Sequence, residues 1–362
     1  MSKNFLKLMV SVLGIGIMVS SCEGCKERKQ KETLFNNGIL VAYEGLYGQN
    51  NGGITYYDID SNIVSADVFR EKNARGLGDT PNDIKLYGGK LYVVVNMSNS
   101  LEVIDVYTGK SLAQLSIKDA NGVGMQPRKI DFYQGKAYLC CYNGQVLKID
   151  TTTLSIENKI QVGKNPEDLC VVGSELYVCN SGGLDYPNCD STISVINLNT
   201  FRISDTIIVS PNPARISVDY QGNVYVACWG ASDWNTFTEI SPNCWQKINT
   251  KTKMVEKTMS IPVNRFVLNS TTAYLLCYDN TIRVFDLASE KEMNNFITDN
   301  TKIDAPYSVA VDAKTGNVLI GDAEDYSTNG TVFVFNKAGK KQYEFETGIN
   351  PTAILPITSN LQ

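Results

Sequence analysis

The chain has 362 residues, a formal net charge of −5, and ten cysteines but no histidine. An acidic protein whose charges are scattered is a poor partner for nucleic acid. A sequence without histidine excludes a His-ligated metal centre and any Ser–His or Cys–His nucleophile pair. These properties favour binding over catalysis, so we expect no catalytic residues, no resident metal and no catalytic cofactor.

The first 21 residues have the organisation of a secretory signal peptide. Lys3 and Lys7 form a basic region, an apolar run follows over residues 8–19, and two serines precede Cys22. The apolar run is too short to span a bilayer as a mature helix. The small–small–Cys pattern resembles a bacterial lipobox, in which Cys22 would be acylated and become the new N-terminus. The alternative is an ordinary signal peptide that is cut elsewhere.

Residues 22–37 are charged and carry few large apolar side chains, so we expect a flexible tether. The predicted organisation is a signal peptide over residues 1–21, a lipidated cysteine with its tether over residues 22–37, and one domain over residues 38–362. The membrane would then be contacted through the lipid alone, and the soluble body would be a monomer.

From residue 38 onward, short β-branched and aromatic runs alternate with Gly, Asn and Asp, which is typical of strands and turns. One unit recurs at intervals of about 40 to 50 residues, the length of a four-stranded propeller blade. Each unit opens with a turn, often Asn–Pro, and continues with a strand centred on Tyr. The seven opening turns lie at Pro81, Pro127, Pro166, Pro213, Val263, Pro306 and Pro351.

Seven such units predict an all-β fold, a seven-bladed β-propeller. The first repeat has no opening strand, and the last opening strand, over residues 352–355, has no strands after it. We therefore expect the C-terminal strand to complete the first blade and close the ring. Residues 64–69 are expected to form the fourth strand of that blade.

Long, irregular loops gather on one face of the predicted propeller, and such loops on a rigid scaffold commonly carry binding sites. Their candidate ligand-binding residues are Tyr47, Asn50, Asn51, Tyr186, Trp229, Trp234 and Tyr326. The ends of the second strands add Asn96, Tyr142, Asn180, Tyr278 and Asp322, and the opening turns add Arg128, Arg215 and Arg265. Rigid aromatics with directed polar groups suit a large amphipathic ligand with amides, with or without a phosphate. For any single Tyr or Trp, the alternative is packing between blades.

Two smaller features leave alternatives open. The loop Gly321–Tyr326 bunches acidic residues, which could hold Ca²⁺ or could form a solvated acidic loop. Cys189 and Cys244 fall in long loops of neighbouring blades and are the best disulfide candidates. The cysteines on the second strands are interpreted as small apolar residues that pack between blades.

Several segments carry a family resemblance, above all Val41-Ala-Tyr-Glu-Gly-Leu-Tyr-Gly-Gln-Asn-Asn-Gly-Gly-Ile-Thr-Tyr-Tyr-Asp58, Leu77-Gly-Asp-Thr-Pro-Asn-Asp-Ile84 and Tyr177-Val-Cys-Asn-Ser-Gly-Gly183. They resemble the YncE-like, surface-layer propeller lipoproteins of Bacteroidota, and within that group the surface vitamin B12-binding lipoproteins. The resemblance implies cobalamin as the ligand on the long-loop face and a TonB-dependent outer-membrane transporter as the partner. It also implies a lipid-anchored protein of the outer membrane that faces the cell surface.

Two other functions fit the same fold. A lactonase-like propeller hydrolase would hold a channel metal with carboxylates, and it would need several Asp, Glu or Asn residues that converge on the channel. A protein-interaction scaffold would present a flat, shallow face without a funnel.

Overall fold

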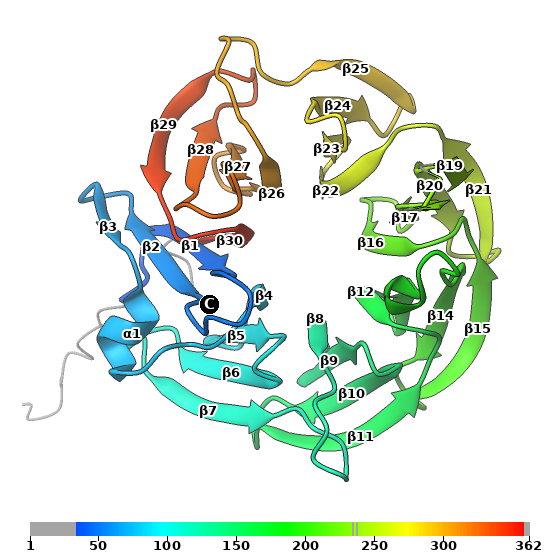
Figure 1. Ribbon diagram of the computed structural model, residues 1–362, viewed down its shortest axis with the longest axis horizontal. Coiled ribbons are helices and arrows are strands. Elements are labelled where there is room, and N and C mark those ends of the chain that lie inside the picture. The colour runs from blue at the N-terminus through cyan, green and yellow to red at the C-terminus, as the bar shows by residue number, and fades with distance from the viewer. Residues whose placement is uncertain (1–33, 234, 237, 358–362) are drawn as a thin grey trace, which may run out of the picture. The chain divides into compact units, whose positions relative to one another are not determined.

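The computed structural model describes residues 34–357, apart from residues 234 and 237. These residues form seven four-stranded antiparallel sheets that follow one another around a ring (Figure 1). The fold is the seven-bladed β-propeller that the repeat predicts. The signal peptide, Cys22 and most of the tether lie outside the described residues, as does Trp234. Within the described part of the chain, no helix is long and apolar enough to cross a membrane.

The strands of each blade run in order from the centre of the ring to its rim. Blade 1 contains β30 (Pro351–Ile357), β1 (Gly38–Tyr43), β2 (Gly53–Asp58) and β3 (Ile63–Ser65). Blade 2 contains β4 (Pro81–Tyr87), β5 (Lys90–Val95), β6 (Ser100–Asp105) and β7 (Ser111–Ser116). Blade 3 contains β8 (Pro127–Tyr133), β9 (Lys136–Cys141), β10 (Gln145–Asp150) and β11 (Ser155–Gln161). Blade 4 contains β12 (Pro166–Val172), β13 (Glu175–Asn180), β14 (Thr192–Asn197) and β15 (Arg202–Ile208).

The remaining three blades follow the same pattern. Blade 5 contains β16 (Pro213–Val218), β17 (Val224–Cys228), β20 (Cys244–Asn249) and β21 (Met254–Met259). Blade 6 contains β22 (Val263–Asn269), β23 (Thr272–Cys277), β24 (Ile282–Asp286) and β25 (Lys291–Asn295). Blade 7 contains β26 (Pro306–Val311), β27 (Val318–Asp322), β28 (Thr331–Phe335) and β29 (Lys341–Glu346). The other elements are the helix α1 (Val68–Asn73), the 3-10 helix η1 (Gly183–Asp185), and a hairpin of β18 (Ala231–Asp233) and β19 (Thr238–Ser241).

The ring closes through its two ends, as the sequence predicts. Strand β30 pairs antiparallel with β1, and Val41 lies opposite Ile354. This pairing removes the free edge that β1 would otherwise present.

The fourth strand of blade 1 is present but is shorter than the expected residues 64–69, because β3 ends at Ser65 and α1 begins at Val68. The Asp67 side chain accepts a hydrogen bond from the Arg70 backbone N–H and so caps the helix. Val68 and Phe69 are buried in the apolar cluster between blades 1 and 2. A helical turn places both side chains on that cluster, whereas alternation along a strand would turn one of them outward.

The hydrophobic core is divided into separate clusters between neighbouring blades. One of them joins Cys179 and Val195 of blade 4 to Val226 and Cys228 of blade 5. Cys141 and Cys277 occupy comparable buried clusters of their own. The second-strand cysteines therefore pack as small apolar residues between blades.

One hydrogen bond recurs in every blade at the long-loop end. The backbone N–H of the residue after each second strand donates to the carbonyl of the residue just before the opening strand. Tyr142, for example, donates to Gln126 at 3.0 Å, and Trp229 donates to Asn212 at 2.9 Å. The acceptor residue has a positive φ in five blades, at Thr80, Gln126, Asn165, Asn212 and Asn350. Asparagine tolerates this conformation well, which accounts for the recurrent Asn–Pro turn.

Aspartates on three opening strands join each blade to the next one. Asp83 accepts a hydrogen bond from the Ile130 backbone N–H at 3.1 Å, and Asp131 accepts one from Val171 at 2.8 Å. Asp168 accepts one from Ile216 at 3.3 Å. Blades 2 to 5 are thus linked near the channel by charged acceptors.

We expect Asp131→Ala to destabilise the fold by about 1–3 kcal/mol, because it leaves the Val171 N–H without its acceptor. It also removes the carboxylate 3.3 Å from the Lys85 ammonium. Urea unfolding at pH 7 measures the loss. Asp205→Ala, on the exposed outer strand β15, is the control and should change the free energy of unfolding by less than about 0.5 kcal/mol.

Candidate ligand-binding site

The mouth is the end of the ring at which each second strand passes into the loop before the third strand. The recurring hydrogen bond brings seven residues to this end, namely Glu44, Asn96, Tyr142, Ser181, Trp229, Tyr278 and Ala323. The start of each opening strand lies beside the end of a second strand. Side chains at these two positions can therefore stack on one another.

Three arginines of the mouth stack on aromatic rings. Arg128 lies 4.5 Å from the centroid of the Tyr142 ring, and Arg215 lies 4.9 Å from Trp229. Arg265 lies 4.5 Å from the Tyr307 ring. The flat guanidinium group stacks on a ring face and keeps its N–H groups at the edge, where they remain available to acceptors.

Glu167, the second residue of β12 in blade 4, binds two of these arginines. Its Oε1 accepts from Arg128 Nη2 at 2.6 Å and from Arg215 Nη1 at 2.8 Å, and the Tyr142 hydroxyl donates to Oε2. The carboxylate is almost completely buried. Burial alone would raise the pKa of Glu167, but the charges of Arg128 and Arg215 outweigh it and lower the pKa to about 2. This buried cluster fixes the mouth across blades 3, 4 and 5.

Further aromatic rings extend the mouth toward solvent. Trp229 contacts Tyr278 edge-on, with ring centroids 6.3 Å apart, and Tyr307 contacts Tyr326 in the same way at 6.0 Å. Tyr278 and Tyr326 are 47% and 54% exposed, although large apolar side chains are usually buried. The mouth therefore presents open aromatic surface above a fixed arginine layer.

The structure brings Arg128, Tyr142, Arg215, Trp229 and Tyr278 of the predicted residues together through these contacts, and Arg265 and Tyr326 lie beside Tyr307. Tyr47, Asn50 and Asn51 lie in an exposed loop of blade 1, where Asn51 Oδ1 accepts from the Leu46 N–H at 2.8 Å. The Tyr186 hydroxyl accepts from the Ser232 N–H and so ties the η1 loop to the β18–β19 hairpin.

Asn96, Asn180 and Asp322 are buried and brace loops. Asn96 donates to the Pro127 carbonyl at 3.0 Å, and Asn180 accepts from the Gly163 N–H at 3.1 Å. Asp322 accepts from the N–H groups of residues 304 and 305 at 2.9 and 2.8 Å. Asn180 and Asp322 are the last residues of their strands, one position before the mouth residues Ser181 and Ala323.

Sequence reasoning missed Glu167, Tyr307 and Glu44. Glu167 and Tyr307 both follow the first residue of an opening strand, the position that Arg128 holds in blade 3. Glu44 follows a second strand, as Tyr142 and Trp229 do, and its Oε2 accepts from the Tyr307 hydroxyl at 3.0 Å. Alignment of the repeats at these two positions could have found all three residues.

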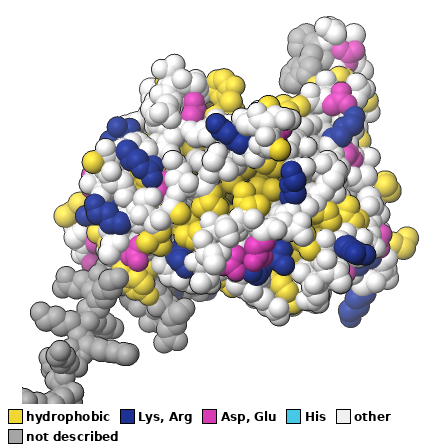
Figure 2. All heavy atoms as spheres, turned by 90° about the horizontal axis from the view of Figure 1, so that it is seen from below, with side chains coloured by type: hydrophobic (Ala, Val, Ile, Leu, Met, Phe, Trp, Pro, Cys, Tyr) yellow, Lys and Arg dark blue, Asp and Glu magenta, His cyan; other side chains and the backbone are white. Residues whose placement is uncertain are grey.

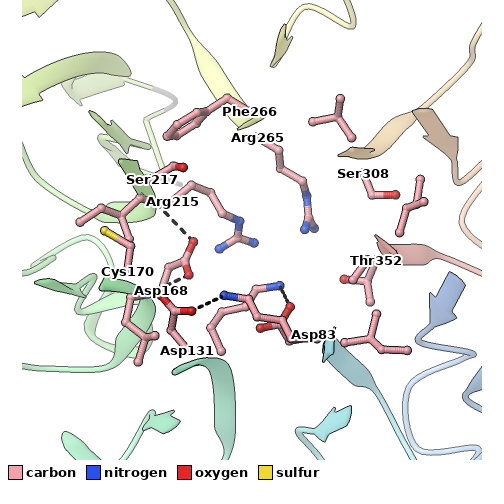
Figure 3. A pocket seen from close by; sticks show the side chains of 18 of the residues that line it. Asp83, Asp131, Asp168, Cys170, Arg215, Ser217, Arg265, Phe266, Ser308 and Thr352 are labelled. Carbon is pink, nitrogen blue, oxygen red and sulfur yellow. Dashed lines mark hydrogen bonds and ion pairs between the residues drawn. The ribbon is translucent and has the colours of Figure 1, made fainter. Parts of the chain in front are cut away.

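A cavity of about 430 Å³ lies inside the ring and is lined by the opening strands (Figure 3). Charged residues of both signs line it, namely Asp83, Lys85, Lys129, Asp131, Asp168, Arg215 and Arg265. Lys85 and Lys129 pair with Asp131 and Asp83 at 3.3 and 3.6 Å, whereas Asp168 accepts the Ile216 backbone N–H. Blades 7 and 1 contribute Ser308 and Thr352 instead of charges.

The acidic residues of the loop Gly321–Tyr326 accept local hydrogen bonds. Asp325 accepts from the N–H groups of Ser327 and Thr328 at 2.9 and 2.8 Å, and Glu324 accepts from the Thr331 hydroxyl. Across residues 34–357, with 234 and 237 left out, no group of three or more His, Cys, Asp or Glu side chains is placed to hold a metal ion.

The expected disulfide between Cys189 and Cys244 is not formed, because both residues are free thiols. Cys244 begins β20, a strand and not a loop, and it lies directly opposite Cys228 of β17. The Cys228 Sγ donates to Gln246 Oε1 at 3.6 Å. The adjacent Cys228 thiol and Ser210 lower the pKa of Cys244 to about 7. The two cysteines therefore face each other within one blade, and Cys189 is not their neighbour in the sheet.

Under oxidising conditions we expect a disulfide between Cys228 and Cys244, since opposite residues of antiparallel strands have the Cα separation that a disulfide requires. Peptide mapping without reductant, after treatment with oxidised glutathione, identifies the bond. Cys228→Ser should abolish it and leave Cys244 alkylatable. A Cys189–Cys244 peptide in the wild-type map would contradict this prediction.

Comparison with known proteins identifies the sequence family of the chain. The model of the family described as "Domain of unknown function (DUF5074)" matches residues 37–350. The chain belongs to the DUF5074 family. No curated protein matches this DUF5074 chain significantly.

Solved structures share the fold of the DUF5074 chain at low sequence identity. A quinoprotein alcohol dehydrogenase-like protein of Bacteroides thetaiotaomicron superposes with a TM-score of 0.65 and 17% identity, over 90% of this chain and 79% of its own. The hydrazine synthase of Kuenenia stuttgartiensis gives a TM-score of 0.60 and 16% identity, over 75% of this chain and 88% of its own. At these identities the likeness concerns the fold alone.

The side of the ring seen in Figure 2 carries charges of both signs. In Figure 2, which views the molecule from the side, Lys and Arg side chains are interspersed with Asp and Glu. This side of the DUF5074 chain offers no basic stripe of the kind that binds nucleic acid.

Proposed function

We propose that this DUF5074 protein binds a corrinoid, such as vitamin B12, at the mouth of its propeller. The observation that carries the proposal is the layer of three arginines, each stacked on an aromatic ring, beneath exposed tyrosines. A corrinoid is a wide, amphipathic molecule with many amide groups, and it needs flat apolar contacts together with directed N–H donors. The resemblance of the first-blade segment, residues 41–58, to B12-binding surface lipoproteins supports the same ligand.

The mouth is suited to binding because its lower layer is rigid. Glu167 joins Arg128 to Arg215, and Trp229 Nε1 donates to the Asn264 carbonyl at 3.0 Å. A ligand would therefore meet side chains that are already ordered, and the entropy cost of binding would be low. No step of this function requires a catalytic residue.

Calorimetric titration of the purified full chain with cyanocobalamin tests the proposal. We expect saturable binding of one ligand per chain and a ligand-dependent rise of the melting temperature. Protoporphyrin, which is flat and of comparable width but lacks the amides, is the control and should not compete. The absence of both binding heat and a change of the melting temperature at saturating cyanocobalamin would contradict the proposal.

We further propose that Cys22 carries a lipid that anchors the protein in the outer membrane, where it passes its ligand to a TonB-dependent transporter. The basic, apolar and small–small–Cys segments before Cys22 support the anchor. Radiolabelled palmitate should be incorporated into the wild-type protein in cells. Cys22→Ser should abolish the labelling, and labelling that persists would contradict the anchor.

A further inference from the structure

The charges around the inner cavity are unevenly distributed. Blades 2 to 4 supply Asp83, Asp131 and Asp168, and each carboxylate accepts a backbone N–H of the next blade. The charged residues that blades 5 and 6 supply to the cavity lining are Arg215 and Arg265. The acidic side of the cavity is therefore committed to the scaffold, whereas the opposite side carries two cations.

Arg215 and Arg265 extend from neighbouring blades into the same part of the cavity (Figure 3). Arg215 is 8% exposed and gives Nη1 to Glu167, but its buried Nε has no hydrogen-bond partner. Arg265 has no ion pair with any residue in the described part of the chain, and its Nε is likewise buried and unpartnered. Buried N–H groups of this kind are costly unless an acceptor satisfies them.

The charge of Arg265 is poorly compensated. Burial and the charge of Arg215 together lower the pKa of Arg265, and they outweigh Tyr307, Glu44 and Glu167. Arg215 and the nearby Lys129 have carboxylate partners, Glu167 at 2.8 Å and Asp83 at 3.6 Å. Arg265 has none in the described part of the chain, and a cation with an unpartnered N–H donor is the complement of an anion.

We propose that the cavity between Arg215 and Arg265 is a binding site for an oxyanion, a phosphate or carboxylate group. The planar guanidinium groups would bind its oxygens in pairs, and the unpartnered Nε atoms would supply two of the donors. Arg215 also stacks on Trp229, so the site lies directly beneath the mouth. The anion is either free in solution or an acidic group of a larger ligand that enters from the mouth.

The test uses inorganic phosphate and the full chain. At constant ionic strength and pH 7, replacement of chloride by phosphate should raise the melting temperature in proportion to the logarithm of the phosphate concentration. Arg265→Met should abolish this rise and should melt higher than the wild type in chloride, because it removes a half-buried charge without an ion pair and a buried, unpartnered Nε. Arg202→Met, on the exposed outer strand β15, should retain the rise.

Two further measurements complete the test. Arg265→Lys keeps the charge but loses the paired donors, so phosphate should bind this variant more weakly; this arm remains informative if Arg265→Met does not fold. In a titration with cyanocobalamin, competition by phosphate would assign the site to an acidic group of that ligand, and independent binding would assign it to a free anion. Equal melting temperatures of the wild type in phosphate and chloride, or a full response in Arg265→Met, would overturn the proposal whether or not cyanocobalamin binds.

Discussion

Glu167→Gln is expected to destabilise the propeller by about 3–5 kcal/mol, the cost of removing one partner from a buried ion pair. In the wild type, Arg128 Nη2 and Arg215 Nη1 lie 2.6 and 2.8 Å from Glu167 Oε1. The substitution leaves these two cations close together without the carboxylate that neutralises them. Urea unfolding of the wild type and the variant at pH 7 measures the difference.

Glu290→Gln provides a matched control. Glu290 also joins two cations, Lys247 at 2.7 Å and Lys257 at 2.8 Å, but its side chain is 30% exposed. Solvent screens such pairs, so the control should lose less than about 1 kcal/mol. Similar losses for both variants would show that the Glu167 cluster contributes no more than a surface ion pair.

The same cluster predicts acid sensitivity. The pKa of Glu167 is about 2 in the folded protein, whereas an unfolded glutamate titrates near about 4.3. The unfolded chain therefore takes up the proton first as the pH falls, and the stabilisation is lost between about pH 4.3 and 2. The wild type should lose more stability over this range than Glu167→Gln. Parallel pH profiles would contradict this assignment.

Tyr278→Ala is expected to weaken cyanocobalamin binding by about 10- to 30-fold, because a rigid exposed aromatic at the centre of a site is a typical hot spot. Tyr278 is 47% exposed and contacts Trp229 edge-on, so its loss removes contact area and should leave the fold intact. Calorimetric titration gives the dissociation constant of each variant.

Tyr220→Ala is the control for this experiment. Tyr220 is 51% exposed and lies in the turn between β16 and β17, at the end of the ring opposite the mouth. Its removal should leave the dissociation constant unchanged. Equal affinities of the wild type and Tyr278→Ala would exclude the mouth as the binding surface.

The repeat was sufficient to predict the fold, because the blades carry similar opening turns and four strands in the same order. The closing strand followed from the unequal ends of the sequence, and β30 pairs with β1 as expected. The helix α1 could not be anticipated, since Val68 and Phe69 suit a strand and only the shape of the cluster between blades 1 and 2 favours a helix.

The mouth was predicted less accurately than the fold. Tyr142, Trp229 and Tyr278 follow their strands directly and are at least partly exposed. Asn96 holds the same position but is buried and donates to the Pro127 carbonyl, so the position in the repeat does not by itself decide whether a side chain is exposed. Glu167 escaped notice because a lone glutamate after a proline has no distinctive pattern. Its role depends on Arg128 and Arg215, which lie far from it in sequence.

The pairing of Val41 with Ile354 also constrains how quickly the protein can acquire its fold. The contact joins the two ends of the domain, so the entropy of closing almost the whole chain into a loop opposes it. Contacts of such long range slow folding, and in this ring the partner of β1 is synthesised after all the other described strands. Blades 2 to 7 can assemble during translation, but the first blade must wait with an unpaired edge until β30 has been made.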